Sequence, residues 1–221
     1  MAKVLVVPSD HDACGYYRTR LPYSTIKSDI EFEFSDFLDE SHITNPDITA
    51  FLIQRPVHPE LPQFIRDLKA EGKIVVIETD DNLSNIPANN PWFNQYNKKL
   101  KDYEECLRLA DYIHVATPEH AKYDKTTVFY NAMDLTKYGK RERTGEVHWH
   151  GSRSHRESLD LIKPAIVELT KNKVRVTLMG NKGWLKEQFK EVEFLVLKDW
   201  VKIEDYYMAV KDADVFLTPL P

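Results

Sequence analysis

A short stretch, Ile74-Val75-Val76-Ile77-Glu78-Thr79-Asp80-Asp81, decides the fold that the sequence predicts. Its first four residues are apolar and β-branched, which is typical of a strand buried on both faces of a parallel sheet. Three carboxylates lie where that strand would end. Residues 4–7 form a similar apolar run, and a polar segment with one glycine follows it. Since helix-period segments separate such runs, we expect an α/β protein with polar side chains along one edge of its sheet.

The same alternation continues along the chain. We expect strands at residues 4–7, 31–34, 50–53, 74–77, 112–115, 127–130, 147–150, 175–179, 194–197 and 215–218. We expect helices at residues 18–27, 60–71, 95–110, 157–172, 184–190 and 204–213. Gly72 suits a helix C-cap, the charged and aromatic alternation of 31–34 suits a strand near the sheet edge, and Pro164 should kink or split its helix.

The alternation is interrupted once. Residues 134–146 hold no buried-strand run, and Lys137, Lys140, Arg141 and Arg143 give them the character of an exposed connector. We therefore predict two Rossmann-like parallel-sheet domains, residues 1–133 and 147–221, joined by a linker at 134–146. Its lysines and arginines could attract a polyanionic acceptor, although a charged linker is the simpler interpretation.

Composition excludes several classes of protein. Hydrophobic residues make up 42% of the 221 residues and charged residues 29%, as in ordinary globular proteins. The net charge of −5 argues against non-specific binding to nucleic acid. The apolar run at the N-terminus is too short for a signal peptide or a membrane span. Cys14 and Cys106 lack metal-type spacing and suit free thiols, so we expect a cytoplasmic protein.

The segment Gly151-Ser152-Arg153-Ser154-His155 follows an expected strand and opens an expected helix. A glycine permits close approach of a ligand, a serine can cap the helix, and the helix N-terminus favours an anion, to which Arg153 and His155 would add donors. A phosphate site and an ordinary capped turn are both open interpretations. The segment matches neither the G-x-G-x-x-G fingerprint nor a Walker A loop.

Two further strand ends carry polar clusters. Among Glu78, Asp80 and Asp81, one carboxylate could act as a general base or bind sugar hydroxyls, while a turn or helix cap is the structural alternative. Arg18 would oppose the dipole at the first turn of its helix, so it requires an external anion or a carboxylate partner. Tyr16 and Tyr17 suit either packing or a ligand platform.

His148 and His150 alternate on one strand and should share a face, where a structural role is favoured over metal binding.

The pieces together resemble the GT-B glycosyltransferases, a large and mostly retaining group, and especially its divergent phage and bacterial members. The resemblance spans the chain and rests on the following segments: Cys14-Gly15-Tyr16-Tyr17-Arg18 before Leu21-Pro22, Ile53-Gln54-Arg55, Glu78-Thr79-Asp80-Asp81 before Asn90-Pro91, Ala110-Asp111 before Thr117, Tyr130-Asn131-Ala132-Met133-Asp134, Trp149-His150-Gly151-Ser152-Arg153-Ser154-His155, and Asp214-Val215 before Pro219-Leu220.

This resemblance implies sugar transfer from a nucleotide-diphosphate donor without a cofactor or a bound metal. The C-terminal domain would bind the donor and the N-terminal domain most of the acceptor, which could be glycan, lipid, protein or modified DNA. Gly15, Arg18, Gly151, Ser152, Arg153 and His155 would then face the donor phosphates. Tyr16, Tyr17 and Glu78 would lie on the acceptor side, with Asp80 and Asp81 as the catalytic pair. In a retaining enzyme the leaving phosphate takes the proton, whereas an inverting one would use Asp80 or Asp81 as base.

One departure from the family concerns the region after Pro219-Leu220, where the resembled enzymes carry a helix with paired glutamates for the donor. The resemblance thus predicts an incomplete second domain, either as a truncation or with the missing part supplied by another chain, as in an oligomer. Three alternatives follow: a weakly active or inactive remnant that serves as a binding or assembly module, another GT-B-fold enzyme such as a sugar-nucleotide epimerase, and an oxidoreductase. The last is disfavoured because neither half carries the dinucleotide glycine pattern.

Overall fold

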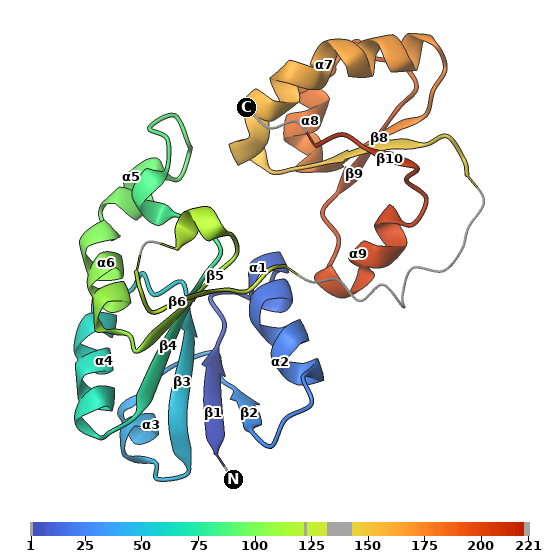
Figure 1. Ribbon diagram of the computed structural model, residues 1–221. Coiled ribbons are helices and arrows are strands. Elements are labelled where there is room, and N and C mark those ends of the chain that lie inside the picture. The colour runs from blue at the N-terminus through green and yellow to red at the C-terminus, as the bar shows by residue number, and fades with distance from the viewer. Residues whose placement is uncertain (1, 122, 132–142, 219–221) are drawn as a thin grey trace. The chain divides into compact units, whose positions relative to one another are not determined.

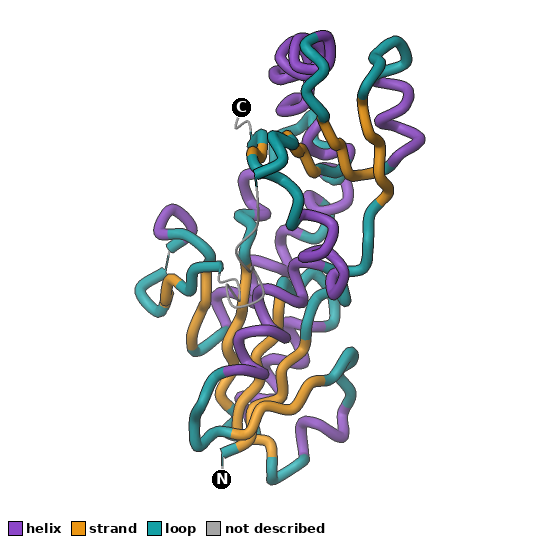
Figure 2. The backbone as a smooth tube through the Cα atoms, turned by 90° about the vertical axis from the view of Figure 1, so that its right-hand side faces the viewer, coloured by secondary structure: helices purple, strands orange, loops and turns teal. Residues whose placement is uncertain are grey.

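A computed structural model describes residues 2–121, 123–131 and 143–218 (Figure 1). The chain divides into two compact units, Met1–Met133 and Asp134–Pro221. Each unit is built on a parallel sheet with helices packed against it, and Figure 2 shows the strands and helices of both units from a second side. The predicted α/β class with two Rossmann-like parallel-sheet units is confirmed.

The first unit contains a six-stranded sheet in the order β2-β1-β3-β4-β5-β6, with every adjacent pair parallel. Its strands are β1 (Lys3–Val7), β2 (Glu31–Phe34), β3 (Ile48–Gln54), β4 (Ile74–Thr79), β5 (Tyr112–Val115) and β6 (Thr126–Val128). The alternating strand β2 lies at the edge, as predicted. The central strands are the apolar runs, because only they are covered on both faces.

Helices cover the two faces of this sheet unequally (Figure 1). On one face, α4 (Leu61–Ala70) and α6 (Leu100–Leu109) pack over the larger core, which includes Leu5, Phe51 and Ile77. The other face carries α1 (Ala13–Gly15), the π-helical turn η1 (Tyr16–Arg20) and α2 (Leu21–Thr25), over a small core of Val6, Tyr23 and Leu52. Leu5 and Val6 thus serve opposite faces, as the two-residue period of a strand requires.

Two helix predictions in the first unit need correction. Helix formation begins at Ala13, before the predicted start at residue 18, so Gly15 to Arg18 are helical rather than part of a loop. The helix predicted for 95–110 is two helices, α5 (Phe93–Asn97) and α6, because the chain turns at Lys98 and Lys99.

Three short helical segments of the first unit were not predicted. They are α3 (Glu40–Thr44) and the single turns η2 (Leu83–Asn85) and η3 (Pro118–His120). The start of α3 is fixed by a capping box, in which Asp39 accepts from the backbone N–H of Ser41 at 2.9 Å and His42 Nδ1 accepts from that of Asp39.

The second unit contains a four-stranded parallel sheet in the order β10-β7-β8-β9. Its strands are β7 (Val147–His150), β8 (Val176–Gly180), β9 (Leu195–Asp199) and β10 (Val215–Phe216), and its helices are α7 (Arg156–Lys171), α8 (Lys182–Gln188) and α9 (Ile203–Val210). The core of this unit includes Trp149, Ile166 and Leu185. Helix α7 runs unbroken through Pro164, so the prediction of a split there was wrong.

Most of the segment predicted as a linker, including Lys137, Lys140 and Arg141, lies outside the described residues. At its end, the backbone N–H groups of Thr144 and Gly145 donate to Asp214 of the second unit. None of the helices in the described ranges combines the length and the apolar character needed to cross a bilayer.

Candidate functional site

Polar side chains gather at the carboxyl ends of β1, β3 and β4 in the first unit. Asp10 follows β1, Arg55 follows β3, and Asp80 and Asp81 follow β4. Because these strands are parallel neighbours, their ends meet at one edge of the sheet, where open α/β sheets bind ligands.

Arg55 joins two of these strand ends. Its Nη2 lies 2.5 Å from Asp80 Oδ1 and 3.0 Å from Asp81 Oδ2, and it also contacts Cys14 Sγ at 3.4 Å. The backbone of Arg55 has a φ of 47°, and its N–H donates to the carbonyl of Glu78 at 2.8 Å. A non-glycine residue in this region is uncommon, and the hydrogen bond to β4 helps to hold it there.

The two aspartates of this cluster differ in environment. Burial acts to raise the pKa of Asp80, but the charge and hydrogen bond of Arg55 outweigh it, so the pKa lies below the ordinary value. A carboxylate with a lowered pKa is a weak base. Asp81 has a side chain 62% exposed, so solvent or a ligand can reach it. Burial raises the pKa of the nearby Cys14 thiol to about 12, which leaves it an inert thiol at neutral pH.

Arg18 and Glu78 form a buried ion pair, with side chains 1% and 0% exposed. Arg18 Nε donates to Glu78 Oε1 at 2.6 Å, and its Nη1 donates to Asn131 Oδ1 at 3.0 Å and to the carbonyl of Phe129. Burial raises the pKa of Glu78 to about 7, although Arg18 favours its ionised form. Of the two partners predicted for Arg18, the structure shows the carboxylate. A phosphate role for Arg18 stays a prediction that would require this pair to open.

Gly15 lies against the Asp10 turn. Asp10 Oδ1 accepts hydrogen bonds from the N–H groups of Asp12 and Gly15, both at 2.9 Å. A Cβ atom on Gly15 would lie 1.9 Å from the carbonyl oxygen of Asp10. The glycine is therefore required by close packing of the chain on itself, and its N–H donates to a carboxylate of the protein. A phosphate role for Gly15 stays a prediction.

The rings of Tyr16 and Tyr17 are both half-buried and pack edge to face, with centroids 5.1 Å apart. This contact fits the packing interpretation, and their role toward an acceptor stays a prediction.

The corresponding strand end of the second unit is Gly151–His155. Ser152 caps the turn, since its hydroxyl accepts from the N–H of Ser154 at 3.3 Å and lies 2.5 Å from the Ser154 hydroxyl. Arg153 and His155 are exposed and form no ion pair with any other described residue. One further turn of chain leads into the 16-residue helix α7. Basic groups without an ion-pair partner among the described residues thus lie at the start of a long helix.

Gly151 and Gly180 lie close together at this edge. A Cβ atom on Gly180 would lie 2.3 Å from the carbonyl oxygen of Gly151, and one on Gly151 would lie 2.4 Å from the Trp149 ring. Both positions exclude larger residues for reasons of packing. Beside them, Asn181 caps α8 by accepting from the N–H of Trp184 at 2.9 Å.

His148 and His150 share one face of β7, as predicted. His148 Nδ1 lies 3.2 Å from His150 Nε2, and His150 Nδ1 lies 2.8 Å from the Tyr206 hydroxyl. Burial lowers the pKa of His150 to about 4, so the ring is neutral at physiological pH. Among the residues that the structure describes, no group of three or more His, Cys, Asp or Glu side chains is arranged to hold a metal ion.

No site role was predicted from the sequence for three residues of the first unit's edge: Asp10, Gln54 and Arg55. Gln54 is 3% exposed and ties the β1 loop to β3, because its Oε1 accepts from the N–H of Ser9 and its Nε2 donates to the carbonyl of Cys14. The available signal was position, since Gln54 and Arg55 close a strand whose carboxyl end lies beside that of β4.

Comparisons with known proteins give matches among solved structures. No protein-family model matches the sequence. No curated protein matches it either. Among solved structures, the chain is similar to a UDP-glucosyltransferase from Polygonum tinctorium in complex with 3,4-dichloroaniline, at 10% identity and a TM-score of 0.47, covering 97% of this chain and 75% of that one. It is also similar to UGT2 of Phytolacca americana in complex with UDP-2-fluoro-glucose and pterostilbene, at 9% identity and a TM-score of 0.46, covering 98% and 75%. Similarities at this level leave the residues of the site unassigned.

Proposed function

We propose that the protein is a glycosyltransferase that moves a sugar from a nucleotide-diphosphate donor to an acceptor. The support is the ordered set of segments that resembles the GT-B enzymes, together with two parallel-sheet units whose polar residues follow the strand ends. In such sheets the carboxyl edge is where ligands bind.

The observation that carries the donor assignment is the exposed strand end at Gly151–His155. Arg153 and His155 have no ion-pair partner among the described residues, and Ser152 and Ser154 offer hydroxyl groups beside them. A diphosphate is a strong anion that matches a helix N-terminus flanked by basic side chains. We assign the donor phosphates to this segment of the second unit.

The first unit is proposed to supply the acceptor side, with Tyr16, Tyr17 and Glu78 near the acceptor and Asp80 and Asp81 as the catalytic pair. We further propose a retaining, metal-independent reaction, in which basic groups stabilise the leaving diphosphate and a donor phosphate oxygen takes the acceptor's proton. If the reaction inverts configuration, Asp81 is the better base, because its side chain is 62% exposed and that of Asp80 only 15%, although Arg55 pairs with both.

A second candidate function is a binding or assembly module without catalysis. It is favoured by the state of the first unit's edge, where Arg18 is paired with Glu78 and Arg55 with Asp80. Arginines that pair with carboxylates of the chain are not available to stabilise the charge that develops during a reaction.

Titration with nucleotide diphosphates and nucleotide sugars tests the donor assignment. A ligand that binds the folded chain raises its melting temperature in proportion to RT ln(1 + [L]/Kd). We expect at least one of the UDP and GDP series to raise it, and Arg153→Ala to abolish the shift. Arg156→Ala is the matched control, because Arg156 begins the same helix but lies 3.8 Å from its own partner Asp160.

Absence of a shift with every nucleotide, or an unchanged shift in Arg153→Ala, would remove the donor assignment. Donor hydrolysis then separates the two functions. Release of free sugar from the donor that binds identifies an enzyme, and binding without hydrolysis or transfer identifies a binding module.

A further inference from the structure

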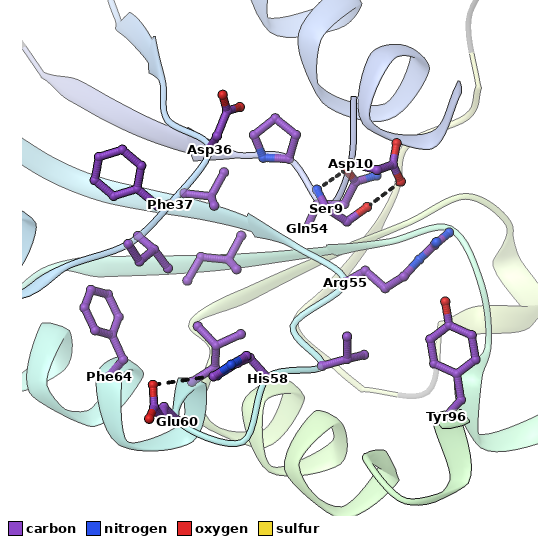
Figure 3. A pocket seen from close by; sticks show the side chains of 16 residues that line it. Ser9, Asp10, Asp36, Phe37, Gln54, Arg55, His58, Glu60, Phe64 and Tyr96 are labelled. Atoms are coloured by element: carbon purple, nitrogen blue, oxygen red, sulfur yellow. Dashed lines mark hydrogen bonds and ion pairs between the residues drawn. The ribbon is translucent and has the colours of Figure 1, made fainter. Parts of the chain in front are cut away.

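A pocket of about 580 Å³ opens in the first unit at the carboxyl ends of β1, β2 and β3 (Figure 3). Segments that follow these strands line it, together with side chains from α4 and α5. Cavities of about 300–1,000 Å³ are the usual size for small-molecule sites. Asp10, Gln54 and Arg55, which form the polar edge of the sheet, also line this pocket.

The body of the pocket is apolar. Leu38, Val57, Leu61 and Phe64 line it and are only half-buried, and Phe37 at its margin is 63% exposed. In Figure 3 the rings of Phe37 and Phe64 lie at one end, and Arg55 and Tyr96 lie at the other. When a ligand covers apolar side chains that are partly exposed to water, the free energy of the system falls. The apolar lining, with two aromatic rings at one end, therefore suits a ligand with a flat apolar body.

The charges of the pocket act against anions. Three carboxylates line it, those of Asp10, Asp36 and Glu60. The basic groups of the lining are the His58 imidazole, which lies 3.8 Å from Glu60, and the Arg55 guanidinium. That guanidinium is already held by Asp80 and Asp81. A phosphate or carboxylate ligand would thus meet an acidic surface without an uncommitted arginine. This distinguishes the pocket from the Gly151–His155 segment, whose exposed groups are basic.

The polar end of the pocket offers neutral hydrogen-bonding groups. The Tyr96 hydroxyl forms no hydrogen bond with another residue of the described ranges, and it can both donate and accept. Ser9 lines the same pocket, with a hydroxyl 2.9 Å from Asp10 Oδ2. A ligand hydroxyl group matches these partners, since it too donates and accepts.

We propose that this pocket binds a small uncharged molecule with a flat apolar body and a hydroxyl group. The body lies between Phe37 and Phe64, and the hydroxyl lies toward Tyr96 and Arg55. The identification of this molecule as the sugar acceptor rests on the proposed function, and binding itself does not. With that identification, the acceptor is a small apolar alcohol or phenol rather than a glycan, a protein or DNA.

Calorimetric titration of the full chain with 2-naphthol and naphthalene-2-sulfonate tests the proposal, in the absence of any nucleotide. The two probes share one ring system and differ in charge at neutral pH. We expect saturable binding of 2-naphthol and at least about tenfold weaker binding of the sulfonate, a difference of one decade in Kd. Equal affinities, or no saturable binding of 2-naphthol up to about 1 mM, would overturn the proposal.

Variants localise the binding. Leu61→Trp fills the pocket from α4 and should weaken 2-naphthol binding by about tenfold or more. Gln63→Trp is the matched control, because Gln63 is exposed on the same helix and does not line the pocket. Phe37→Ala provides a second test that leaves the core intact, because Phe37 is largely exposed. Binding at parental affinity in both Leu61→Trp and Phe37→Ala would place the ligand elsewhere and end the proposal.

The two proposals fail separately. Binding of 2-naphthol without any nucleotide binding leaves this pocket assigned and removes the glycosyltransferase. Nucleotide binding and donor hydrolysis without 2-naphthol binding leaves the enzyme and removes the small apolar acceptor.

Discussion

In each unit a glycine and then an arginine follow the first strand of the sheet in sequence, and the structure gives the two pairs different surroundings. After β1, Gly15 and Arg18 lie in the helical segment, with the Gly15 N–H bonded to Asp10 and Arg18 buried against Glu78. After β7, Gly151 is followed by Arg153, which is exposed and forms no ion pair with described residues. A glycine and an arginine at a strand end can therefore belong to either of two kinds of edge. At a closed edge they bind carboxylates of the chain itself, and at an open edge the arginine is accessible to a ligand.

The ion pairs that close the first edge join residues far apart in the sequence. Arg18 and Glu78 are sixty residues apart in sequence, and Arg55 and Asp80 are twenty-five apart. A buried arginine without a carboxylate would be strongly destabilising, so each of these pairs is a structural requirement of the first unit. At the second edge, the neutral Ser152 caps the turn after β7. Asn181 caps α8, where Asp199 Oδ1 also accepts from the N–H of Lys182 at 3.0 Å.

The largest expected effect comes from breaking the buried pair. Arg18→Met keeps the side-chain volume but leaves Glu78 without its cation, and we expect a loss of about 3–5 kcal/mol in the free energy of unfolding at pH 8. Urea denaturation of the full chain followed by circular dichroism measures the loss, and hydrogen exchange in β4 places it in the first unit. The double variant Arg18→Met/Glu78→Gln should recover part of it. A loss below about 1 kcal/mol would show that the pair does not hold this edge closed.

The next effect is a dependence of stability on pH. Because the pKa of Glu78 is raised from 4.5 to about 7 in the folded state, the folded chain binds more protons between these values. Its contribution is therefore complete below about pH 4.5 and is lost as the pH rises through about 7, with a slope of up to about 1.4 kcal/mol per pH unit.

Three histidines work in the opposite direction over the same range. Burial lowers the pKa of His114, His148 and His150, so their contribution grows as the pH rises through the unfolded value of about 6.5. The informative quantity is the difference in unfolding free energy between the parent and Glu78→Gln, measured from pH 5 to pH 8. That difference should change steadily from pH 5 to about 7 and level off above it, and a constant difference would contradict the raised pKa.

An intermediate effect is expected at the glycines. Gly15→Ala places a Cβ atom 1.9 Å from the backbone oxygen of Asp10, and we expect a loss of about 1–3 kcal/mol in the free energy of unfolding. Gly183→Ala is the matched control inside α8, where the nearest atom would lie 3.6 Å away. Helix propensity should make that variant more stable, by up to about 1 kcal/mol. Equal effects of the two substitutions on the melting temperature would mean that the Asp10 turn can shift to accept the Cβ atom without loss of stability.

The sequence predicts the frame of the fold better than its edges. Runs such as Ile74–Ile77 identify buried strands, because only apolar β-branched residues suit a strand covered on both faces. The alternation in β2 correctly marks an edge strand. The early start of helix formation at Ala13 was not predictable from its own residues, since it depends on Asp10 folding back to accept from Gly15. Short helices such as α3 depend on a local cap rather than on a hydrophobic period.

The candidate sites follow the same rule. That polar residues would lie at strand ends follows from topology, and this holds for Asp80, Asp81 and Gly151–His155. Which charges pair, and which stay exposed, depends on contacts between segments far apart in sequence. The pocket between Phe37 and Tyr96 was not predictable from the sequence, because the residues that line it are spread from position 7 to position 96.

The smallest effect on stability is expected at the Gly151–His155 strand end, and it provides the most direct test of the difference between the two strand ends. Arg153 is exposed and has no ion pair to lose within the described ranges, so Arg153→Ala should change the free energy of unfolding by no more than about 0.5 kcal/mol. Urea denaturation beside Arg18→Met provides the measurement. An arginine whose removal costs no stability is free to serve a ligand, whereas one whose removal unfolds its unit is not. A loss above about 1 kcal/mol in Arg153→Ala would mean that the second edge is also closed from within, and the difference between the two strand ends would disappear.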